Sequence, residues 1–140
     1  MAYTLSVSGI HSANLPQESV NSFSPHTETP RTNDGRGVDT AVTMTISGVI
    51  RSVDENAIAD ETIGLAKWAT EYDDAKAYSA VAATAIASGQ VLREVKYPQA
   101  FVVGYREKFD ITKGVGTYDI TVRQKKDLLE QVQVSGGFTD

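Results

Sequence analysis

The residues that could do chemistry in this 140-residue chain are few and widely spaced. Its two histidines, His11 and His26, lie in a stretch rich in Ser, Asn, Thr and Pro, without an HExxH spacing. Zinc sites need several His, Cys or carboxylate ligands at short spacings. The chain has no cysteine, which excludes disulfides, thiolate metal sites and cysteine nucleophiles. We therefore predict solvated histidines and no metal site.

A run of carboxylates is the second candidate for chemistry. Its members are Asp54, Glu55, Asp60 and Glu61. They lack the alternating Asp/Asn order and the closing glutamate of a calcium-binding loop. A solvated acidic loop is the simpler interpretation. A small hydrolase using carboxylates between residues 54 and 74 stays open as an alternative, because two carboxylates about 5–10 Å apart support glycoside hydrolysis.

The remaining motif is the glycine pair in Gly114-Val115-Gly116. Phosphate-binding loops are followed by a lysine or by the start of a helix, and this one is not, so a hairpin turn is predicted. No serine lies in a nucleophile-elbow pattern. The sequence therefore predicts a protein that is not an enzyme and that binds no cofactor.

Composition limits the function further. The chain is 41% hydrophobic, has a mean hydropathy of -0.24 and carries a net charge of -5. This balance is typical of one globular domain spanning residues 1–140, and it disfavours direct nucleic-acid binding, which needs basic surface. No apolar run has the length of a membrane anchor, and the N-terminus lacks a signal-peptide pattern. We expect synthesis in the cytoplasm and, if the protein is released, a route without a cleaved signal.

One amphipathic helix is predicted over residues 74–88. Tyr78, Val81, Ala82, Ala85 and Ile86 recur at three- and four-residue spacing. Asp73 and Asp74 could cap its start, and Gly89 is a typical helix stop.

The other segments with regular patterns alternate as strands do. We predict strands over residues 3–7, 39–50, 62–70, 91–97, 100–109, 117–125 and 129–134, with a weaker edge strand at 20–28. Residues 11–37 form a long polar loop around that weak strand. The fold class is therefore mainly β (α+β): a single-domain β-barrel or sandwich of about seven or eight strands with one amphipathic α-helix packed against it. The predicted core comprises Val42, Met44, Ile46, Leu65, Val81, Ile86, Val95, Val103, Ile120 and Val122.

The order of these elements resembles the tail-tube family of contractile injection systems, which includes the haemolysin-coregulated protein (Hcp) of type VI secretion. The resemblance rests on residues 65–68, the Asp73-Asp74 pair, the alanine-rich stretch 78–87, Ser88-Gly89-Gln90, and Glu94-Val95. The later segments 101–109, 113–116, 118–122 and 132–136 follow in the family's order. Ala75-Lys76-Ala77 replaces the Ser-Pro that the family has at this point.

The resemblance implies a structural subunit that self-assembles into stacked hexameric rings, in a phage-tail-like or type VI-like apparatus. It implies a homo-oligomer with sheath, baseplate or spike proteins as further partners, located in a virion or injection particle. It also implies that the long loop contacts neighbouring subunits. We predict the following interface residues: Leu15, Val20, Phe23, His26, Asp34, Gly35, Arg36, Gly37, Val38, Tyr72 and Tyr97.

A second interpretation remains open from the residues alone. A monomeric β-barrel that recognises a peptide or carbohydrate through its Ser/Asn/Thr-rich loop would show the same composition. Assembly separates the two, because a tube subunit forms rings or filaments and a binding module stays monomeric.

Overall fold

The computed structural model describes residues 1–28, 40–50, 62–110, 112 and 115–137. The strands are β1 (Ala2–Ser8), β2 (Ala13–Leu15), β3 (Val20–Glu28), β4 (Ala41–Ile50), β5 (Ser79–Ala87), β6 (Gln90–Asp110), β7 (Val115–Gln124) and β8 (Gln133–Gly136). One α-helix, α1 (Ile63–Ala69), and two 3-10 turns, η1 (Asp74–Lys76) and η2 (Lys126–Gln131), complete the described part. No helix in these ranges is long and apolar enough to cross a membrane. The predicted fold class, mainly β with one helix, is confirmed.

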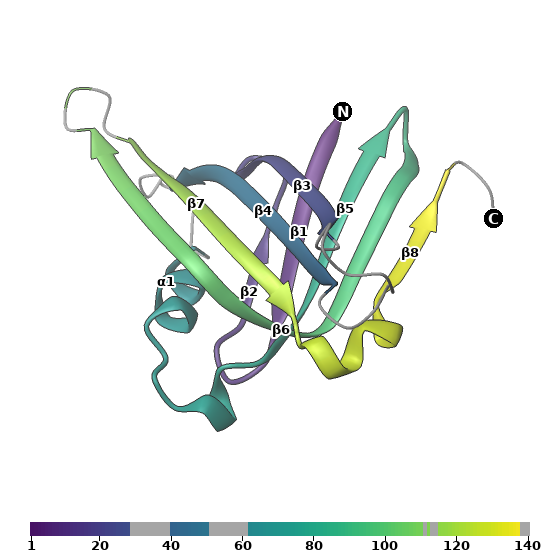
Figure 1. The fold of residues 1–140 in the computed structure, drawn as a ribbon. Helices are drawn as coiled ribbons and strands as arrows, with labels where there is room; N and C mark the ends of the chain where they lie inside the picture. The colour runs from purple at the N-terminus through teal and green to yellow at the C-terminus, as the bar shows by residue number, and fades with distance from the viewer. Residues whose placement is uncertain (29–39, 51–61, 111, 113–114, 138–140) are drawn as a thin grey trace.

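The strands form one antiparallel sheet in the order β2-β1-β5-β6-β7-β4-β3, with β8 also paired to β6 (Figure 1). The 21-residue β6 organises this sheet. Its first half pairs with β5 and β8, and its second half pairs with β7. The sheet therefore folds over along β6 into two halves, β2-β1-β5 and β7-β4-β3.

The two halves face each other and meet at their far sides. Tyr3 on β1 and Phe23 on β3 form an edge-to-face aromatic pair with ring centroids 5.6 Å apart. On the opposite side α1 lies beside β6 (Figure 1) and buries Leu65 and Trp68. The result is a nearly closed barrel with the helix covering one opening.

A buried glutamine holds the bend of β6. Pro98 has no N–H to donate, and it lies where the register between β5 and β6 shifts, so the ladder skips it. At the next residue, the Gln99 N–H donates to Oε1 of Gln124 at 3.1 Å, and the Gln99 carbonyl accepts from the Lys125 N–H at 2.8 Å. The Gln124 amide nitrogen donates to the Leu128 carbonyl at 2.9 Å, so one side chain joins β6, β7 and η2.

The core lies between the two halves of the sheet. Seven of the ten predicted core residues are buried: Met44, Ile46, Leu65, Val81, Val95, Ile120 and Val122. Val42 packs partly buried against this core and Ile86 is half-buried, whereas Val103 is 46% exposed because it lies in a bulge of β6. Two buried tyrosines donate across the interior, Tyr97 to the Thr43 carbonyl at 3.0 Å and Tyr118 to the Ser19 carbonyl at 2.8 Å.

The predicted helix over residues 74–88 is wrong, because most of this segment is strand β5. Its buried residues Ser79, Val81, Ala83 and Ala85 alternate with period two. Alanine fits either structure, and here the small side chains lie in a strand between β1 and β6. The predicted helix cap is confirmed only for Asp73, which caps the three-residue η1 and not a long helix.

The predicted strand over residues 62–70 is also wrong, because it contains α1. Leu65 and Trp68 lie three residues apart, so they share a helical face that turns to the core. Gly64 permits this approach, since a β-carbon there would come within 2.2 Å of the Ser12 carbonyl oxygen.

Other boundaries shift. The two strands predicted on either side of Pro98 are one strand, β6. The predicted strand over residues 129–134 is mostly η2, and β8 begins at Gln133. The predicted polar loop over residues 11–37 contains β2 and β3, and the weak edge strand at 20–28 is confirmed as β3.

Replacing Gln124 should destabilise the fold. In Gln124→Met the Gln99 N–H and the Leu128 carbonyl lose their partner, and because both bonds are only part-buried we expect a loss of about 1–2 kcal/mol, near the net worth of a hydrogen bond. Urea denaturation measures the change in unfolding free energy. The exposed Gln133→Met is the matched control and should change little; equal effects of the two substitutions would contradict the role of Gln124 at the bend.

Candidate assembly surface

The outer face of β3, β4, β7 and the second half of β6 is lined by short polar side chains. We define the hydroxyl face by its Ser and Thr residues: Ser22, Ser24, Thr45, Ser47 and Thr121, with Thr43 in the same strand positions but buried beneath Arg123. They lie in rows that cross the strands in register, and the rows read Ser22, Ser47, Asp119, Arg106, then Ser24, Thr45, Thr121, Gly104, then His26, Thr43, Arg123, Phe101. The alternation of threonines with buried apolar residues in β4 and β7 produces this face.

The row that contains Asp119 and Arg106 is internally compensated. Asp119 accepts from the Ser47 hydroxyl at 2.5 Å and from the Arg106 guanidinium at 3.2 Å. The hydrogen bond from Ser47 and then that from Arg106 lower the pKa of Asp119 below its ordinary value. Arg106 is largely exposed, so this ion pair adds little stability. The pair balances the charge of its own row, while Arg123 lies in another row of the face.

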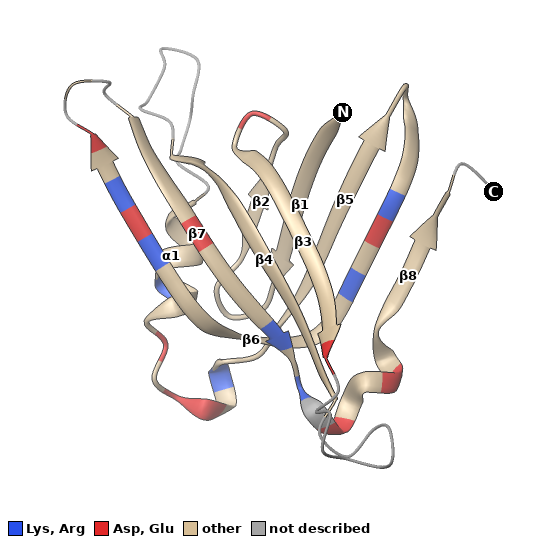
Figure 2. Ribbon diagram, turned by 45° about the horizontal axis from the view of Figure 1, so that its top comes forward, with Lys and Arg blue, Asp and Glu red and all other residues tan. Residues whose placement is uncertain are grey.

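Charge is concentrated on one strand of the sheet. Strands β1, β2, β4, β5 and β8 contain no Lys, Arg, Asp or Glu, whereas β6 carries charges along both halves (Figure 2). The faces that β1, β2, β4, β5 and β8 present to solvent are therefore uncharged and carry mainly hydroxyl groups and alanines.

Both side edges of the hydroxyl face lack a strand neighbour within the described residues. β3 pairs with β4 alone. On the other side, residues 101–104 and 106–109 of β6 pair only with β7, because the pairing with β5 ends at Ala100. Such edges present backbone groups in a direction where another strand can add.

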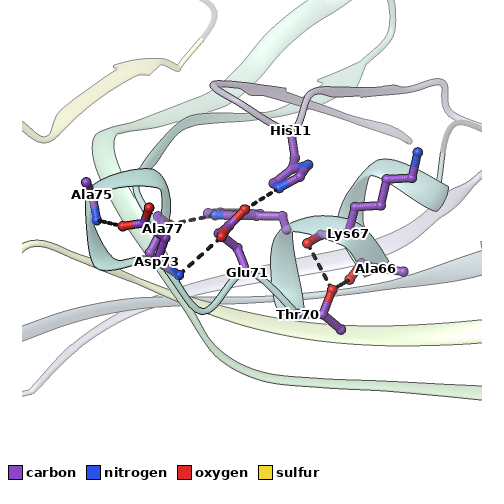
Figure 3. A network of polar contacts seen from close by, with 9 residues as sticks. His11, Ala66, Lys67, Thr70, Glu71, Asp73, Ala75 and Ala77 are labelled. Atoms are coloured by element: carbon purple, nitrogen blue, oxygen red, sulfur yellow. Dashed lines mark hydrogen bonds and ion pairs between the residues drawn. The ribbon is translucent and has the colours of Figure 1, made fainter.

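A polar network fastens α1 to the turn after β1 (Figure 3). Nε2 of His11 lies 2.8 Å from Oε2 of Glu71, and both side chains are partly buried. The other Glu71 oxygen accepts from the Asp73 N–H at 3.1 Å. The Trp68 indole N–H donates to the Ala77 carbonyl at 2.7 Å. These bonds hold the end of α1 and η1 against the turn.

The hydrogen bonds of this network also determine the protonation of Glu71. The bond with His11 and then the bond from the Asp73 N–H lower the pKa of the Glu71 carboxyl below 4.5. Glu71 is therefore ionised near neutral pH, where it can accept both bonds.

The structure divides the predicted interface residues into groups. Leu15, Val20 and Tyr97 are almost completely buried and belong to the core of the single chain, so their side chains offer no exposed surface. Phe23 is partly buried against Tyr3. The predicted residues Asp34, Gly35, Arg36, Gly37 and Val38 lie outside the described residues.

Two predicted interface residues are exposed. His26 lies on the open edge strand β3, at the margin of the hydroxyl face. Tyr72, between α1 and η1, is 94% exposed. They lie on different elements, so the structure does not gather the predicted set into one patch, and their role in an interface stays a prediction.

The described residues form no cluster suited to metal binding. They contain no group of three or more His, Asp or Glu side chains that could hold a metal ion. His11 lies in the turn after β1 and is paired with Glu71, whereas His26 lies on the edge strand β3. The acidic residues Asp54, Glu55, Asp60 and Glu61 lie outside the described part.

A shallow hollow of about 340 Å³ lies on the other half of the sheet. Its lining includes Ser6 and Ser8 of β1, Ala80 of β5, and Lys96 and Pro98 of β6. The hollow is open, and Lys96 already contacts Glu94 at 3.3 Å.

The polar side chains that join distant segments were not predicted from the sequence. Ser47, Asp119 and Arg106 had no distinguishing motif, and their only signal was the alternation that puts each on the outer side of its strand. The His11–Glu71 pair carried no signal, because the two residues are 60 positions apart.

Two Hcp1 proteins are among the known structures of similar shape. Hcp1 from Flavobacterium johnsoniae matches with a TM-score of 0.56 and 17% identity, over 99% of this chain and 97% of that one. Hcp1 from the E. coli EAEC 042 pathovar, in a mutant form, gives a TM-score of 0.58 and 10% identity, over 97% and 99%. The chain has the Hcp-like tail-tube fold.

The tail-tube fold extends to a third relative, from the PVC sheath-tube complex of an extracellular contractile injection system in its extended state. It gives a TM-score of 0.53 and 14% identity, over 96% of this chain and 88% of that one. No protein-family model and no curated protein sequence matches the chain. At these identities the likeness is one of fold, and at that level it confirms the tail-tube resemblance.

The network around Glu71 should make stability depend on pH. A carboxyl whose pKa is lowered by folding stabilises the native state above its ordinary value of 4.5, and this contribution is lost as pH falls through the lowered value. Glu71→Gln should therefore be less stable than the wild type near pH 7, and the difference should shrink near pH 3. Urea denaturation at both pH values measures it. Glu130→Gln, on the exposed part of η2, is the control, and a pH-independent difference for Glu71→Gln would contradict this account.

Proposed function

We propose that this protein is a tube subunit of a contractile injection apparatus and that it assembles into closed rings. The observation that supports this best is the hydroxyl face, a four-stranded polar surface with no further strand paired at either side edge among the described residues. Two different edges on one surface suit a head-to-tail contact, in which β3 of one copy meets β6 of the next. Such heterologous contacts close into a ring when the rotation per copy fits.

The chemistry of the hydroxyl face suits the wall of a channel. Threonine and serine keep water at the surface without offering an apolar patch to an unfolded or passing chain. The Arg106–Asp119 pair balances the charge of its own row, and the middle row of Ser24, Thr45 and Thr121 is uncharged, so most of the face offers a passing polyanion or polycation little to bind. We propose that this face lines the lumen.

The proposal includes partners and location. The PVC relative is part of a sheath-tube complex, and other matches come from a tube-terminating cap and a baseplate of the anti-feeding prophage. By analogy we propose that copies of this chain meet sheath and baseplate components in an injection particle, as a structural and not a catalytic part. Stacking of hexameric rings belongs to the same proposal.

The hollow on the other half of the sheet supports the competing function, a monomeric binding module. Its volume of about 340 Å³ is at the small end of ligand sites, which run from about 300 to 1,000 Å³. Negative-stain electron microscopy with light scattering separates the two functions. Rings or hollow filaments support the tube subunit, whereas a monomer of 15.1 kDa at every concentration contradicts it and directs attention to the hollow.

A charge at the open edge of β6 should weaken ring formation. Val103 is 46% exposed in the part of β6 without a strand neighbour opposite β7, so Val103→Lys places a charge where strand edges would meet. We expect the dissociation constant of one subunit contact to rise roughly tenfold, about 1.4 kcal/mol, with the melting temperature unchanged, so that assembly needs a higher protein concentration. Light scattering measures the assembled fraction.

The matched control is Val91→Lys in the same strand. Val91 is 41% exposed, but it lies where β6 already pairs with β5. This variant should assemble like the wild type. If Val103→Lys assembles equally well, the open part of β6 is not the ring contact.

A further inference from the structure

Residues 62–77, which we name the cover, lie outside the sheet. They comprise α1 and η1, and neither takes part in a strand pair. A helix of seven residues is too short to be stable by itself in water. α1 therefore depends on its packing against the barrel, where Leu65 and Trp68 are 0% and 2% exposed. The cover can leave the barrel without breaking any strand pair.

The cover meets the barrel at the turn between β1 and β2, residues 9–12 (Figure 3). Gly64 lies so close to this turn that a β-carbon would come within 2.2 Å of the Ser12 carbonyl oxygen. Nε2 of His11 lies 2.8 Å from Oε2 of Glu71, so this pair links the turn to the end of the cover. The turn and the cover are thus held together by one close backbone approach and one polar bond between side chains.

A buried hydroxyl beside the same turn opposes this closed arrangement. Ser79 is 3% exposed, and its Oγ forms no hydrogen bond within the described part of the chain. The turn lies directly against this oxygen, because a β-carbon on Gly9 would come within 2.3 Å of it. A buried polar group without a partner destabilises the arrangement that buries it. Movement of the turn would let water reach the hydroxyl.

The Glu71 carboxylate is the ionisable group on which the closed arrangement depends. The bond with His11 and then the bond from the Asp73 N–H lower its pKa, and Lys76 of η1 adds a weaker attraction. β1 and β2 contain no charged residue, and neither Lys67 of α1 nor the charged residues of β6 contribute to this shift. A carboxyl with a lowered pKa favours the closed arrangement above its ordinary value of 4.5, and this contribution is lost as the pH falls through the lowered value.

We propose that acidification opens the cover while the barrel stays folded. In the open arrangement the cover separates from the turn at residues 9–12, Trp68 reaches solvent and the Ser79 hydroxyl becomes hydrated. The strand pairs remain, because none of them uses a residue of the cover. Segments can open locally at a lower free energy than that of global unfolding. The cover is then an acid-sensitive closure at one end of the barrel.

Trp68 is the single tryptophan of the chain, so its fluorescence reports on the cover alone. Its emission and its quenching by acrylamide are followed in the full chain from about pH 7 to about pH 2.5, beside far-UV circular dichroism of the strands. We expect Trp68 to become exposed below about pH 4.5, with the strand signal persisting through this transition. Coincident loss of both signals, or a Trp68 that stays buried throughout, would overturn the proposal. Exposure of Trp68 already above about pH 6 would do the same, because the Glu71 carboxyl is ionised there.

Two substitutions should shift the opening in opposite directions. Glu71→Gln removes the charge, so the acrylamide quenching constant of Trp68 near pH 7 should rise severalfold and lose most of its dependence on pH. Ser79→Ala removes the unpaired hydroxyl, so the Trp68 transition should move to lower pH. Glu130→Gln on η2 is the control and should titrate like the wild type. An unchanged Trp68 transition in Glu71→Gln would assign the opening to another group and contradict the proposal.

Discussion

The structure depends on a single strand that takes part in both halves of the barrel. β6 must pair with β5 and β8 over its first half and with β7 over its second, so it has to bend without leaving a buried backbone group unsatisfied. Gln124 meets this requirement, because its side chain accepts from Gln99 at the bend and donates to η2. The position of β7, and with it the hydroxyl face, follows from this bend.

The bend also explains why the first half of β6 has strand neighbours on both sides and the second half has one on one side only. Beyond Ala100 the second half of β6 leaves β5 and keeps only β7, which creates the open edge. The first half carries β8 on the same side of the strand that β7 occupies further along. The proposed ring contact joins the edge of this freed half to β3 of the next copy.

The strands were largely predictable from the sequence, and the helix was not. In β4 and β7, buried apolar residues alternate with polar residues, and this period of two is typical of a strand with one solvent-facing side. In β5 the run of alanines satisfies both period two and period 3.6, so only its pairing with β1 and β6 decides the structure. For α1, seven residues are too few for a helical period to stand out, and burial of Leu65 and Trp68 selects the helix. The site residues were hidden because Ser47, Asp119 and Arg106 meet only after three strands have paired.

The pairing of strands has a consequence for how the chain folds. β5, β6 and β7 follow one another along the sequence, so their hairpins close short loops and we expect them to form early. β1 and β4 pair with β5 and β7 from far upstream and must wait for those strands to be made during synthesis. Until they are covered, the nascent meander exposes strand edges on both sides, a state prone to pairing with other chains. A subunit that polymerises through one strand edge must therefore cover its other edges first. Here β1 and β4 cover them, and they do so only when the fold is complete. Completion of the fold thus decides between ordered assembly and aggregation.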